Sequence, residues 1–188
     1  KPVNLLHFAF MGSAYYSIIY NVESPRVALL NNGAEEEKGN ELAKETFPLL
    51  KNAPINFIGN KEGSDFMSGD VDDMVTDGFA GNALLKGTEG AVSAVVSILK
   101  KSIKSHFLSM IGAIFMKKTY KDIKNRVDIQ KKHAGSPLPG WKKLVVKNHG
   151  SCARANILAS IEQTMKLYEN KLNQKIEEAI LKLEETEN

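Results

Sequence analysis

The apolar positions of this chain follow two periods, one typical of helices and one typical of buried strands. Residues 2–20 are predominantly apolar, which predicts a mostly buried helix beginning at Pro2, since proline is tolerated in a first helical turn. Residues 26–31, 55–59 and 71–76 are short runs that end in polar or glycine-containing loops. Such runs indicate strands of a parallel sheet buried on both faces.

Helical patterns separate these runs and dominate the rest of the chain. We expect helices over about residues 40–51 and 79–116, a strongly basic helical run over about 117–132, and one or two helices over 154–185. Strands that alternate with helices predict an α/β layered domain.

Residues 134–140 predict a loop, because Pro137 and Pro139 each lack a backbone donor. A further strand is expected over 144–147, followed by a turn over 149–151.

The composition is that of an ordinary globular domain. The chain has 188 residues, of which 43% are hydrophobic and 25% charged, and no stretch approaches the roughly 18 uninterrupted apolar residues of a membrane span. Its first residue is Lys1, with neither a charged leader nor a cleavage site, so we expect a cut within a longer protein. A lone Cys152 excludes an intramolecular disulfide and fits a reducing cytoplasm, its simplest interpretation being a small packed side chain.

Charge is distributed unevenly along the chain. Residues 100–147 contain 13 Lys and Arg against two Asp, a net charge of +11, whereas the remainder has 12 basic and 20 acidic residues, a net charge of −8. This asymmetry indicates a surface for an anionic partner, which could be a membrane, a nucleic acid or an acidic protein. Nucleic acid is disfavoured, because aromatic residues are not interleaved with the basic ones.

Ligands of parallel α/β sheets bind beyond the carboxyl ends of the strands, so the loops there are candidate sites. The first loop, 31–42, places Gly33, Lys38, Gly39 and Asn40 before a helix, where backbone donors and an ammonium suit a phosphate or an oxyanion. Plain turn chemistry explains such a loop equally well.

The second loop, 76–86, runs from a strand into a helix. Asp77 could cap the helix or orient neighbouring groups. Asn82 and Lys86 lie four residues apart on one helical face, where both could point at one anion. A purely structural role is the alternative.

Two further loops carry less information. Residues 59–63 could be a turn only, and 147–151 place His149 and Ser151 after a strand, where a structural histidine is the commoner case. The sequence contains no nucleophile elbow, metal-ligand spacing or phosphate-binding Walker loop.

An apolar face with cationic flanks runs through residues 98–132, which we interpret as a basic amphipathic helical hairpin. This pattern suits the interface of an anionic bilayer, although a hairpin packed in a dimer interface is the alternative. The candidate membrane contacts are Ile103, Phe107, Met110, Ile111, Ile114 and Phe115.

Several motifs in this order resemble the PlsX family of phosphate acyltransferases. They are Phe10-Met-Gly-Ser13, Ser24-Pro-Arg-Val27, Leu29-Leu-Asn31, Lys38-Gly-Asn-Glu-Leu42, Ile55-Asn-Phe-Ile-Gly-Asn60, Thr76-Asp-Gly-Phe79 with Gly81-Asn82, and Lys147 with His149-Gly-Ser151. The chain departs from the family in Ala134-Gly-Ser-Pro-Leu-Pro-Gly140, where Gly-Gly-Ala-Pro-Leu-Leu-Gly is usual, and in Asn148 and Cys152, where Ala and Ser are usual.

The resemblance implies a three-layer α/β/α fold similar to isocitrate and isopropylmalate dehydrogenases, in a homodimer. It implies that residues 1–188 are the C-terminal part of a single domain, that the N-terminal half is absent, and that this chain alone is inactive. It also implies a cytoplasmic enzyme at the inner face of the bacterial cell membrane.

The implied reaction joins inorganic phosphate to the acyl group of acyl-acyl carrier protein and feeds phospholipid synthesis. Phosphate is itself the nucleophile in this reaction, which agrees with the absence of a nucleophilic triad. Neither a metal nor a cofactor is expected. The candidate catalytic residues are Lys38, Asn40, Asp77, Asn82, Lys86 and His149. The candidate phosphate- or substrate-binding residues are Gly33, Gly39, Gly78, Gly81, Gly150 and Ser151.

Other functions stay open on the sequence. A phosphotransacetylase-like enzyme would use acyl-coenzyme A as the donor, and a dehydrogenase is disfavoured because these loops lack a set of metal-binding aspartates. A non-enzymatic membrane adaptor would use only the basic segment, which could equally dock the acidic carrier protein.

Overall fold

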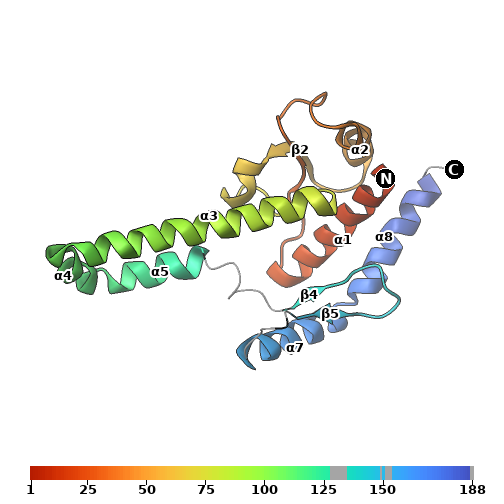
Figure 1. Cartoon of the computed structure of the whole chain (residues 1–188). Coiled ribbons are helices and arrows are strands. Elements are labelled where there is room, and N and C mark those ends of the chain that lie inside the picture. The colour runs from red at the N-terminus through yellow and green to blue at the C-terminus, as the bar shows by residue number, and fades with distance from the viewer. Residues whose placement is uncertain (128–134, 149, 151–153, 187–188) are drawn as a thin grey trace. The chain divides into compact units, whose positions relative to one another are not determined.

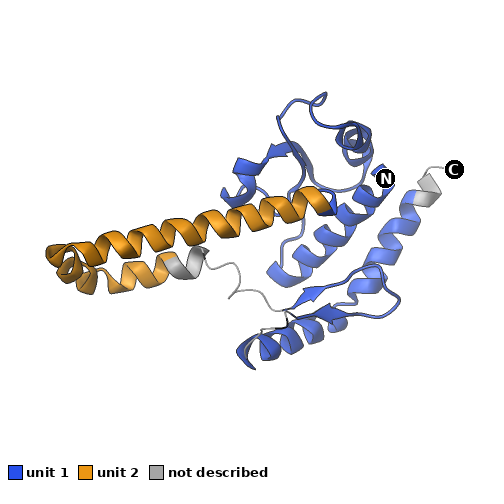
Figure 2. Ribbon diagram, in the orientation of Figure 1, with its two compact units in different colours: residues 1–78, 134–188 blue, residues 79–133 orange. Residues whose placement is uncertain are grey.

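The computed structural model describes residues 1–127, 135–148, 150 and 154–186, with the backbone alone at 124–127 and 184–186, and divides into two compact units (Figures 1 and 2). Unit 1 comprises residues 1–78 and 134–188, and unit 2 comprises residues 79–133. The sequence predicted a single domain with a hairpin over residues 98–132 inside it. Unit 2 contains that segment but begins at residue 79, and the assignment to a single domain stays a prediction.

Unit 1 contains a small parallel sheet. Strands β1 (Val27–Asn31), β2 (Phe57–Glu62) and β3 (Asp73–Val75) pair in the order β2-β1-β3, so β1 is central. The α/β class is therefore confirmed, and all three predicted strands exist, with starts one or two residues later than expected.

One helix precedes these strands, and a second helix and a short 3-10 helix lie between them. Helix α1 (Pro2–Tyr20) precedes β1, α2 (Glu41–Asn52) lies between β1 and β2, and the 3-10 helix η1 (Gly63–Met67) follows β2. Both predicted helices are confirmed in type and nearly in length.

The core of unit 1 lies between the sheet and these helices. Val27 and Leu29 of β1 are fully buried, and they pack with one face of α1, one face of α2 and Val75. A second buried cluster joins Ile18 near the end of α1 to Leu167 and Leu172 of the C-terminal helices. Helix α1 thus contributes to both clusters, in agreement with the prediction of a mostly buried helix.

The C-terminal part of unit 1 is a hairpin followed by two helices. Strands β4 (Ser136–Pro137) and β5 (Val146–Lys147) pair antiparallel, and α7 (Arg154–Glu169) and α8 (Leu172–Thr186) follow. The expectation of a pure loop over 134–140 was wrong in part, because Pro137 occupies a two-residue strand that loses little without one donor. The strand predicted over 144–147 is shorter and belongs to this separate hairpin, which is closed by Leu138 N donating to Val145 O at 2.8 Å.

Unit 2 consists of helices in the part that the structure describes. Helix α3 (Gly78–Ser105) begins at the last residue of unit 1, and α4 (Phe107–Phe115) and α5 (Lys117–Val127) follow. The helix predicted over 79–116 is interrupted at His106, whose backbone is extended (φ −127°, ψ 123°). The predicted start of the basic helix at Lys117 is confirmed. No helix among the described residues is long and apolar enough to span a membrane.

Candidate functional site

Two of the predicted site loops leave the parallel sheet at the same edge. Strands β1 and β3 are neighbours and run in the same direction, so the loop after Asn31 and the loop after Val75 both emerge at their carboxyl ends. The first loop carries Gly33, Lys38, Gly39 and Asn40, and the second carries Asp77 and Gly78. We call this edge the carboxyl-edge site.

Asn31, the last residue of β1, holds the end of the first loop in place. Its side-chain Nδ2 donates to Lys38 O at 3.0 Å, and its Oδ1 accepts from Asn32 N at 2.8 Å. Gly39 has a φ of +98°, and a Cβ at this position would collide with the Asn31 amide. The loop conformation therefore requires glycine at position 39 for both backbone and steric reasons.

The side chain of Asn60 forms a hydrogen bond with the middle of the same loop. It is only 4% exposed, and its Nδ2 donates to Glu35 O at 2.8 Å. The pairing of β1 with β2 shifts register between Val27 and Leu29, and Gly59 in β2 has a φ of +92°. A bulge of this kind adds a residue to one strand, and here it directs Asn60 into the interior beneath the loop.

The loop ends at the N-terminus of α2. Asn40 caps this helix, because its Oδ1 accepts from Ala43 N at 2.9 Å. The side chain of Lys38 is exposed and passes over Gly33, where an added Cβ would lie 3.0 Å from Lys38 Cγ. The exposed Lys38 thus lies two residues before the N-cap of α2. Asn40 was predicted as a catalytic residue, and in the structure its side chain caps this helix.

Acidic side chains lie close to Lys38 in the sequence. Residues 35–37 are all glutamates and all exposed, and Glu36 Oε1 accepts from Lys51 Nζ at 2.6 Å. This ion pair is solvated and so contributes little to stability, but it neutralises one of the three carboxylates next to the loop.

The remaining candidates of the second loop lie on α3 in unit 2. Asn82 and Lys86 are both exposed, and Gly81 precedes them. Lys86 Nζ is 2.8 Å from Glu89 Oε2, so its charge already has a carboxylate partner. That these residues face the same anion as Lys38 stays a prediction.

The fourth loop is described only in part. His149 and Ser151 lie outside the described residues, and Gly150 is an exposed turn residue. The parallel-sheet rule does not apply to this loop, because β5 belongs to the antiparallel hairpin.

A buried serine anchors that hairpin to α7. Ser160 is 3% exposed, and its Oγ accepts from Gly135 N at 2.5 Å and lies 2.7 Å from Asn148 Oδ1. Asn148 therefore replaces the alanine usual in the PlsX pattern with a side chain that has a specific contact.

The carboxyl groups with shifted pKa values lie at the opposite edge of the sheet. Arg26 donates from its backbone N and its guanidinium to Asp72, and this lowers the pKa of the Asp72 carboxyl well below its usual range. Burial raises the pKa of the neighbouring Asp73 to about 7. Burial is also the main cause of the raised pKa values of Tyr15 and Tyr16. Arg26, Asp72 and Asp73 lie at the starts of β1 and β3, whereas the Tyr15 hydroxyl accepts a hydrogen bond from Gln163 of α7. None of these groups lies in the predicted site loops.

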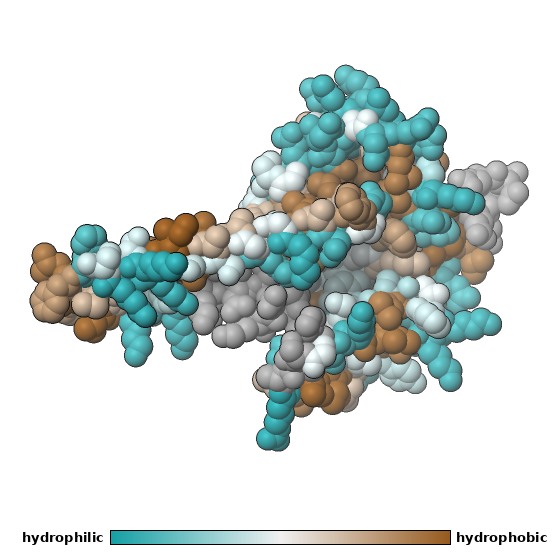
Figure 3. Space-filling view, in the orientation of Figure 1, coloured by the Kyte–Doolittle hydropathy of each residue, from teal (hydrophilic) through white to brown (hydrophobic). Residues whose placement is uncertain are grey.

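The predicted membrane contacts lie on α3 and α4. Ile103 is half-buried, whereas Phe107 and Ile114 are each 72% exposed and Phe115 is 85% exposed. Apolar side chains gather at the end of unit 2 formed by α4 and have hydrophilic ones beside them (Figure 3). Met110 and Ile111 are also exposed.

The sequence analysis did not single out Asn31, Asn60 or Ser160 as site residues. Each of the two asparagines ends or follows an apolar run in the sequence, and this position was the available signal; in the structure Asn31 is the last residue of β1, whereas Asn60 lies within β2. Ser160 lies in the middle of a helical pattern that carries no such signal.

Comparison with known proteins gives a consistent result. The sequence profile of the family described as fatty acid synthesis protein matches residues 1–175. Proteins named phosphate acyltransferase are similar to the chain: that of Thermoanaerobacterium thermosaccharolyticum is 43% identical over 90% of this chain and 50% of its own length. The protein of Campylobacter jejuni is 43% identical over 94% of this chain and 53% of its own length. The protein of Clostridium tetani is 41% identical over 98% of this chain and 55% of its own length. The chain thus spans about half the length of the relatives it matches.

Proposed function

The chain belongs to the fatty acid synthesis protein family, the PlsX family, and we propose that it is the C-terminal part of a phosphate acyltransferase. The reaction transfers the acyl group of acyl-acyl carrier protein to inorganic phosphate and supplies acyl phosphate to phospholipid synthesis. The observation that carries this proposal is the match along nearly the whole chain to relatives that bear the name phosphate acyltransferase.

The chemistry requires two anions to approach one another. A phosphate oxygen attacks the thioester carbonyl, the C–S bond breaks, and the carrier thiol leaves after taking up a proton. The protein must therefore position phosphate and stabilise the oxyanion, since the nucleophile comes from the substrate.

The carboxyl-edge site has groups suited to this work. The exposed ammonium of Lys38 and the backbone donors around Gly33 and Gly39 would bind phosphate, at a loop that Asn31 and Asn60 hold in one conformation. Asp77 would orient the cations. We further propose Asn82 and Lys86 as catalytic residues and Gly78 and Gly81 as phosphate- or substrate-binding residues.

His149 would donate a proton to the leaving thiolate, and Gly150 and Ser151 would contact the substrate. In this proposal Asn40 acts through the N-terminus of α2, which it caps, rather than by direct contact.

The fold proposed for the complete enzyme is the three-layer α/β/α arrangement similar to isocitrate and isopropylmalate dehydrogenases, in a homodimer. The three-stranded parallel sheet with α1 and α2 supports this proposal at the level of the α/β class.

We also propose a peripheral location at the inner face of the cell membrane, and the surface of unit 2 supports it. Its described helices carry exposed apolar side chains on α4 and lysines on the end of α3 and the start of α5. An anionic bilayer suits this combination, and the acidic carrier protein could use the same lysines.

The test is phosphate-dependent release of free carrier protein from a long-chain acyl-acyl carrier protein. The chain would be assayed alone and fused to the N-terminal half of the Campylobacter jejuni relative, with acyl-coenzyme A as a parallel donor. We expect activity in the fusion only and with the carrier protein as donor. Activity with acyl-coenzyme A alone would indicate a phosphotransacetylase-like enzyme.

A matched pair of lysines tests the site itself. Lys38→Ala should lower turnover of the fusion at least ten-fold without unfolding it, whereas Lys44→Ala, an exposed lysine on the neighbouring α2, should leave turnover near normal. Normal turnover of the Lys38 variant would remove this residue from the site.

The net charge of +11 over residues 100–147 favours one further function, a membrane adaptor without catalysis. Vesicle binding by the fusion with no acyl transfer from either donor would support that alternative.

A further inference from the structure

Asn60 of β2 is a buried amide that uses only one of its two polar atoms. Its Nδ2 donates to Glu35 O at 2.8 Å. Its Oδ1 is also buried and has no hydrogen-bond partner among the residues that the structure describes. A buried acceptor without a donor destabilises a fold, whereas an apolar side chain of similar volume at this position carries no such penalty.

The backbone before Asn60 is irregular as well. Val27 pairs with Phe57 and Leu29 pairs with Asn60, so β2 contains one more residue than β1 over this stretch. Gly59, which lies in the extra length, has a φ of +92°. Irregular backbone and an unpartnered buried atom at one residue are features that folds retain at functional sites, for the sake of the contact that they allow.

The contact made by Asn60 determines the position of the Lys38 backbone. Glu35 O, which accepts from Asn60, also accepts from Lys38 N at 3.2 Å. The carbonyl of Lys38 is held separately, because Asn31 Nδ2 donates to it at 3.0 Å. Two side-chain amides from the neighbouring strands β1 and β2 therefore fix the main chain of Lys38 at its N–H and at its carbonyl.

A fixed main chain at Lys38 favours the binding of an anion. The Lys38 side chain is exposed, so it loses conformational freedom when it binds a ligand. Where the backbone is already ordered, binding has to order the side chain alone, and the affinity is correspondingly higher. Phosphate gains most from this arrangement, since the thioester and the acyl chain of the other substrate are uncharged.

We propose that Asn60 is a positioning residue that sets the affinity of the carboxyl-edge site for inorganic phosphate. It acts through Glu35 O on the backbone of Lys38 and does not touch the substrate. This inference rests on the proposed function and adds to it a buried residue on which the strength of phosphate binding depends.

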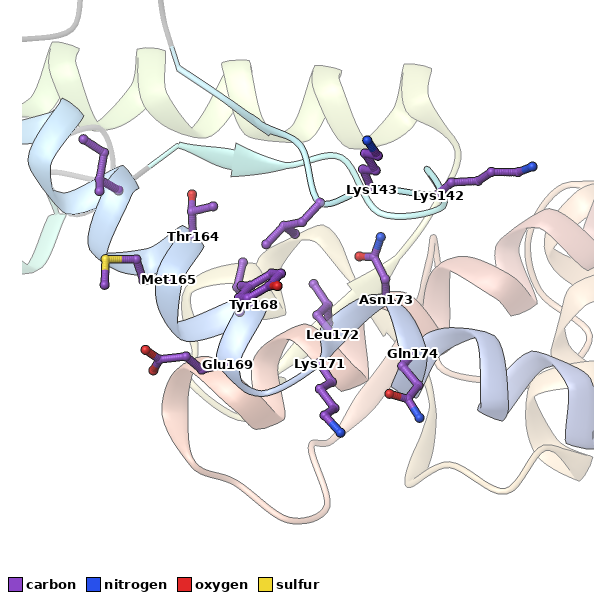
Figure 4. Close-up of a pocket in the computed structure, with 13 residues that line it drawn as sticks. Lys142, Lys143, Thr164, Met165, Tyr168, Glu169, Lys171, Leu172, Asn173 and Gln174 are labelled. Carbon is purple, nitrogen blue, oxygen red and sulfur yellow. The ribbon is translucent and has the colours of Figure 1, made fainter.

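Lys142 and Lys143 are a second pair of cations in unit 1 that could hold an anion. They lie at a groove of about 920 Å³ formed by α7, α8 and the loop of the β4–β5 hairpin. Figure 4 shows both lysines on this loop, opposite Tyr168. The described residues that line the groove include none from β2 or from residues 31–42, so phosphate bound there would not respond to Asn60.

The first test is the binding of inorganic phosphate, measured by titration calorimetry on the chain fused to the N-terminal half of the Campylobacter jejuni relative. Asn60→Leu should weaken this binding about ten-fold or more. Asn56→Leu is the matched control, because Asn56 is exposed and its Nδ2 donates to a carbonyl oxygen, that of Ser24, away from the site loop. The control should leave the affinity unchanged.

Urea unfolding of the same fusion separates positioning from support of the fold. Asn60→Leu removes one hydrogen bond and one unpartnered acceptor, while Glu35 O keeps Lys38 N as a donor. We therefore expect an unfolding midpoint at or above that of the unmodified fusion. A residue with a purely structural role would instead lower the midpoint and leave the phosphate affinity unchanged.

Asn60→Asp supplies a readout that does not depend on whether leucine fits this position. An ionised carboxylate cannot donate to Glu35 O, whereas the protonated carboxyl can, and burial favours the protonated form. The affinity of this variant, divided by that of the unmodified fusion at each pH, should recover as the pH falls from about 8 to about 6. The ratio cancels the titration of phosphate itself and of the charged loop residues 35–38.

Turnover connects the binding result to the reaction. For Asn60→Leu, the KM for phosphate should rise about ten-fold or more, while the KM for acyl-acyl carrier protein stays unchanged. A fusion that binds phosphate but transfers no acyl group would refute the proposed function, and its phosphate affinity would still decide the role of Asn60.

Four outcomes would overturn the proposal. The first is an unmodified fusion that binds no phosphate, and the second is an Asn60→Leu variant that binds phosphate with normal affinity. The third is an Asn60→Asp variant weakened equally at every pH. The fourth is phosphate binding that survives both Asn60 variants and is lost with Lys142→Ala and Lys143→Ala together, which would place the anion in the groove beside α7.

Discussion

The backbone of Gly12 in α1 lies directly against the carboxyl group of Asp73 in β3. A Cβ added at Gly12 would lie 2.5 Å from Asp73 Cγ and 2.6 Å from its Oδ1, so a side chain at position 12 and the present position of Asp73 exclude each other. This close approach lets α1 pack on β3, and it encloses a carboxyl group whose Oδ2 has no hydrogen-bond partner among the described residues.

We predict that Gly12→Ala destabilises unit 1. Overpacking of this kind costs roughly 1–3 kcal/mol, because α1 or β3 must shift to relieve the clash. Urea unfolding followed by circular dichroism measures the loss. Gly90→Ala on α3 is the control, since its added Cβ meets nothing within 4 Å and should stabilise the helix by up to about 1 kcal/mol. Equal effects of the two variants would contradict the proposed clash.

The buried Asp73 should make stability fall as the pH rises. Its pKa is about 7 in the folded chain against 3.8 when unperturbed, so the folded state keeps a proton that the unfolded chain releases near pH 4. The stability associated with this proton is complete below about pH 4 and is lost by about pH 7, by up to roughly 4 kcal/mol in total.

Unfolding at several pH values between 5 and 8 checks this sign. Asp72, whose pKa is lowered by Arg26, is ionised throughout this range and adds no slope. Asp73→Asn should flatten the profile and raise stability at pH 8. A profile unchanged by this substitution would show that another group titrates.

Replacing Gly39 should lower turnover, because it changes the conformation of the loop that carries Lys38. Gly39→Ala forces both a positive φ and a collision with the Asn31 amide, so the loop that carries Lys38 must move. We expect at least a ten-fold loss of phosphate-dependent turnover in the fused enzyme. Gly69→Ala has the same backbone strain (φ +84°) but open space around its Cβ, so it should cost about 1 kcal/mol of stability and leave turnover near normal. Similar turnover of both variants would show that the conformation of this loop does not affect catalysis.

The sequence predicted the parallel strands because short apolar runs such as residues 26–31 have one simple interpretation. It could not predict the bulge at Gly59, which depends on the register between β1 and β2 and decides where Asn60 points. The hairpin at Pro137 was missed because a strand of two residues is too short to show an alternation of apolar and polar residues in the sequence. Lys38 was predicted from its loop, and its role in the site stays a prediction. The capping role of Asn40 follows from a hydrogen bond that the motif alone does not specify.

The break at His106 shows the same limit in unit 2. Apolar spacing continues through this residue, so the pattern predicts one helix, while the backbone separates α3 from α4. Phe107 and Ile114, on which the last prediction depends, both lie on α4 beyond this break.

Phe107→Asp together with Ile114→Asp should lower binding to vesicles of phosphatidylglycerol and phosphatidylcholine at least ten-fold. Both side chains are 72% exposed on α4, and burying an aspartate in the bilayer interface is costly. Co-sedimentation measures the bound fraction, and Val95→Asp on α3, where the valine is 64% exposed, is the matched control. Added salt should weaken the binding of the unmodified chain, because the lysines of α3 and α5 attract the anionic lipid. Binding that survives both aspartates but falls with salt would assign the contact to the lysines alone and would leave the apolar face of α4 for a protein partner.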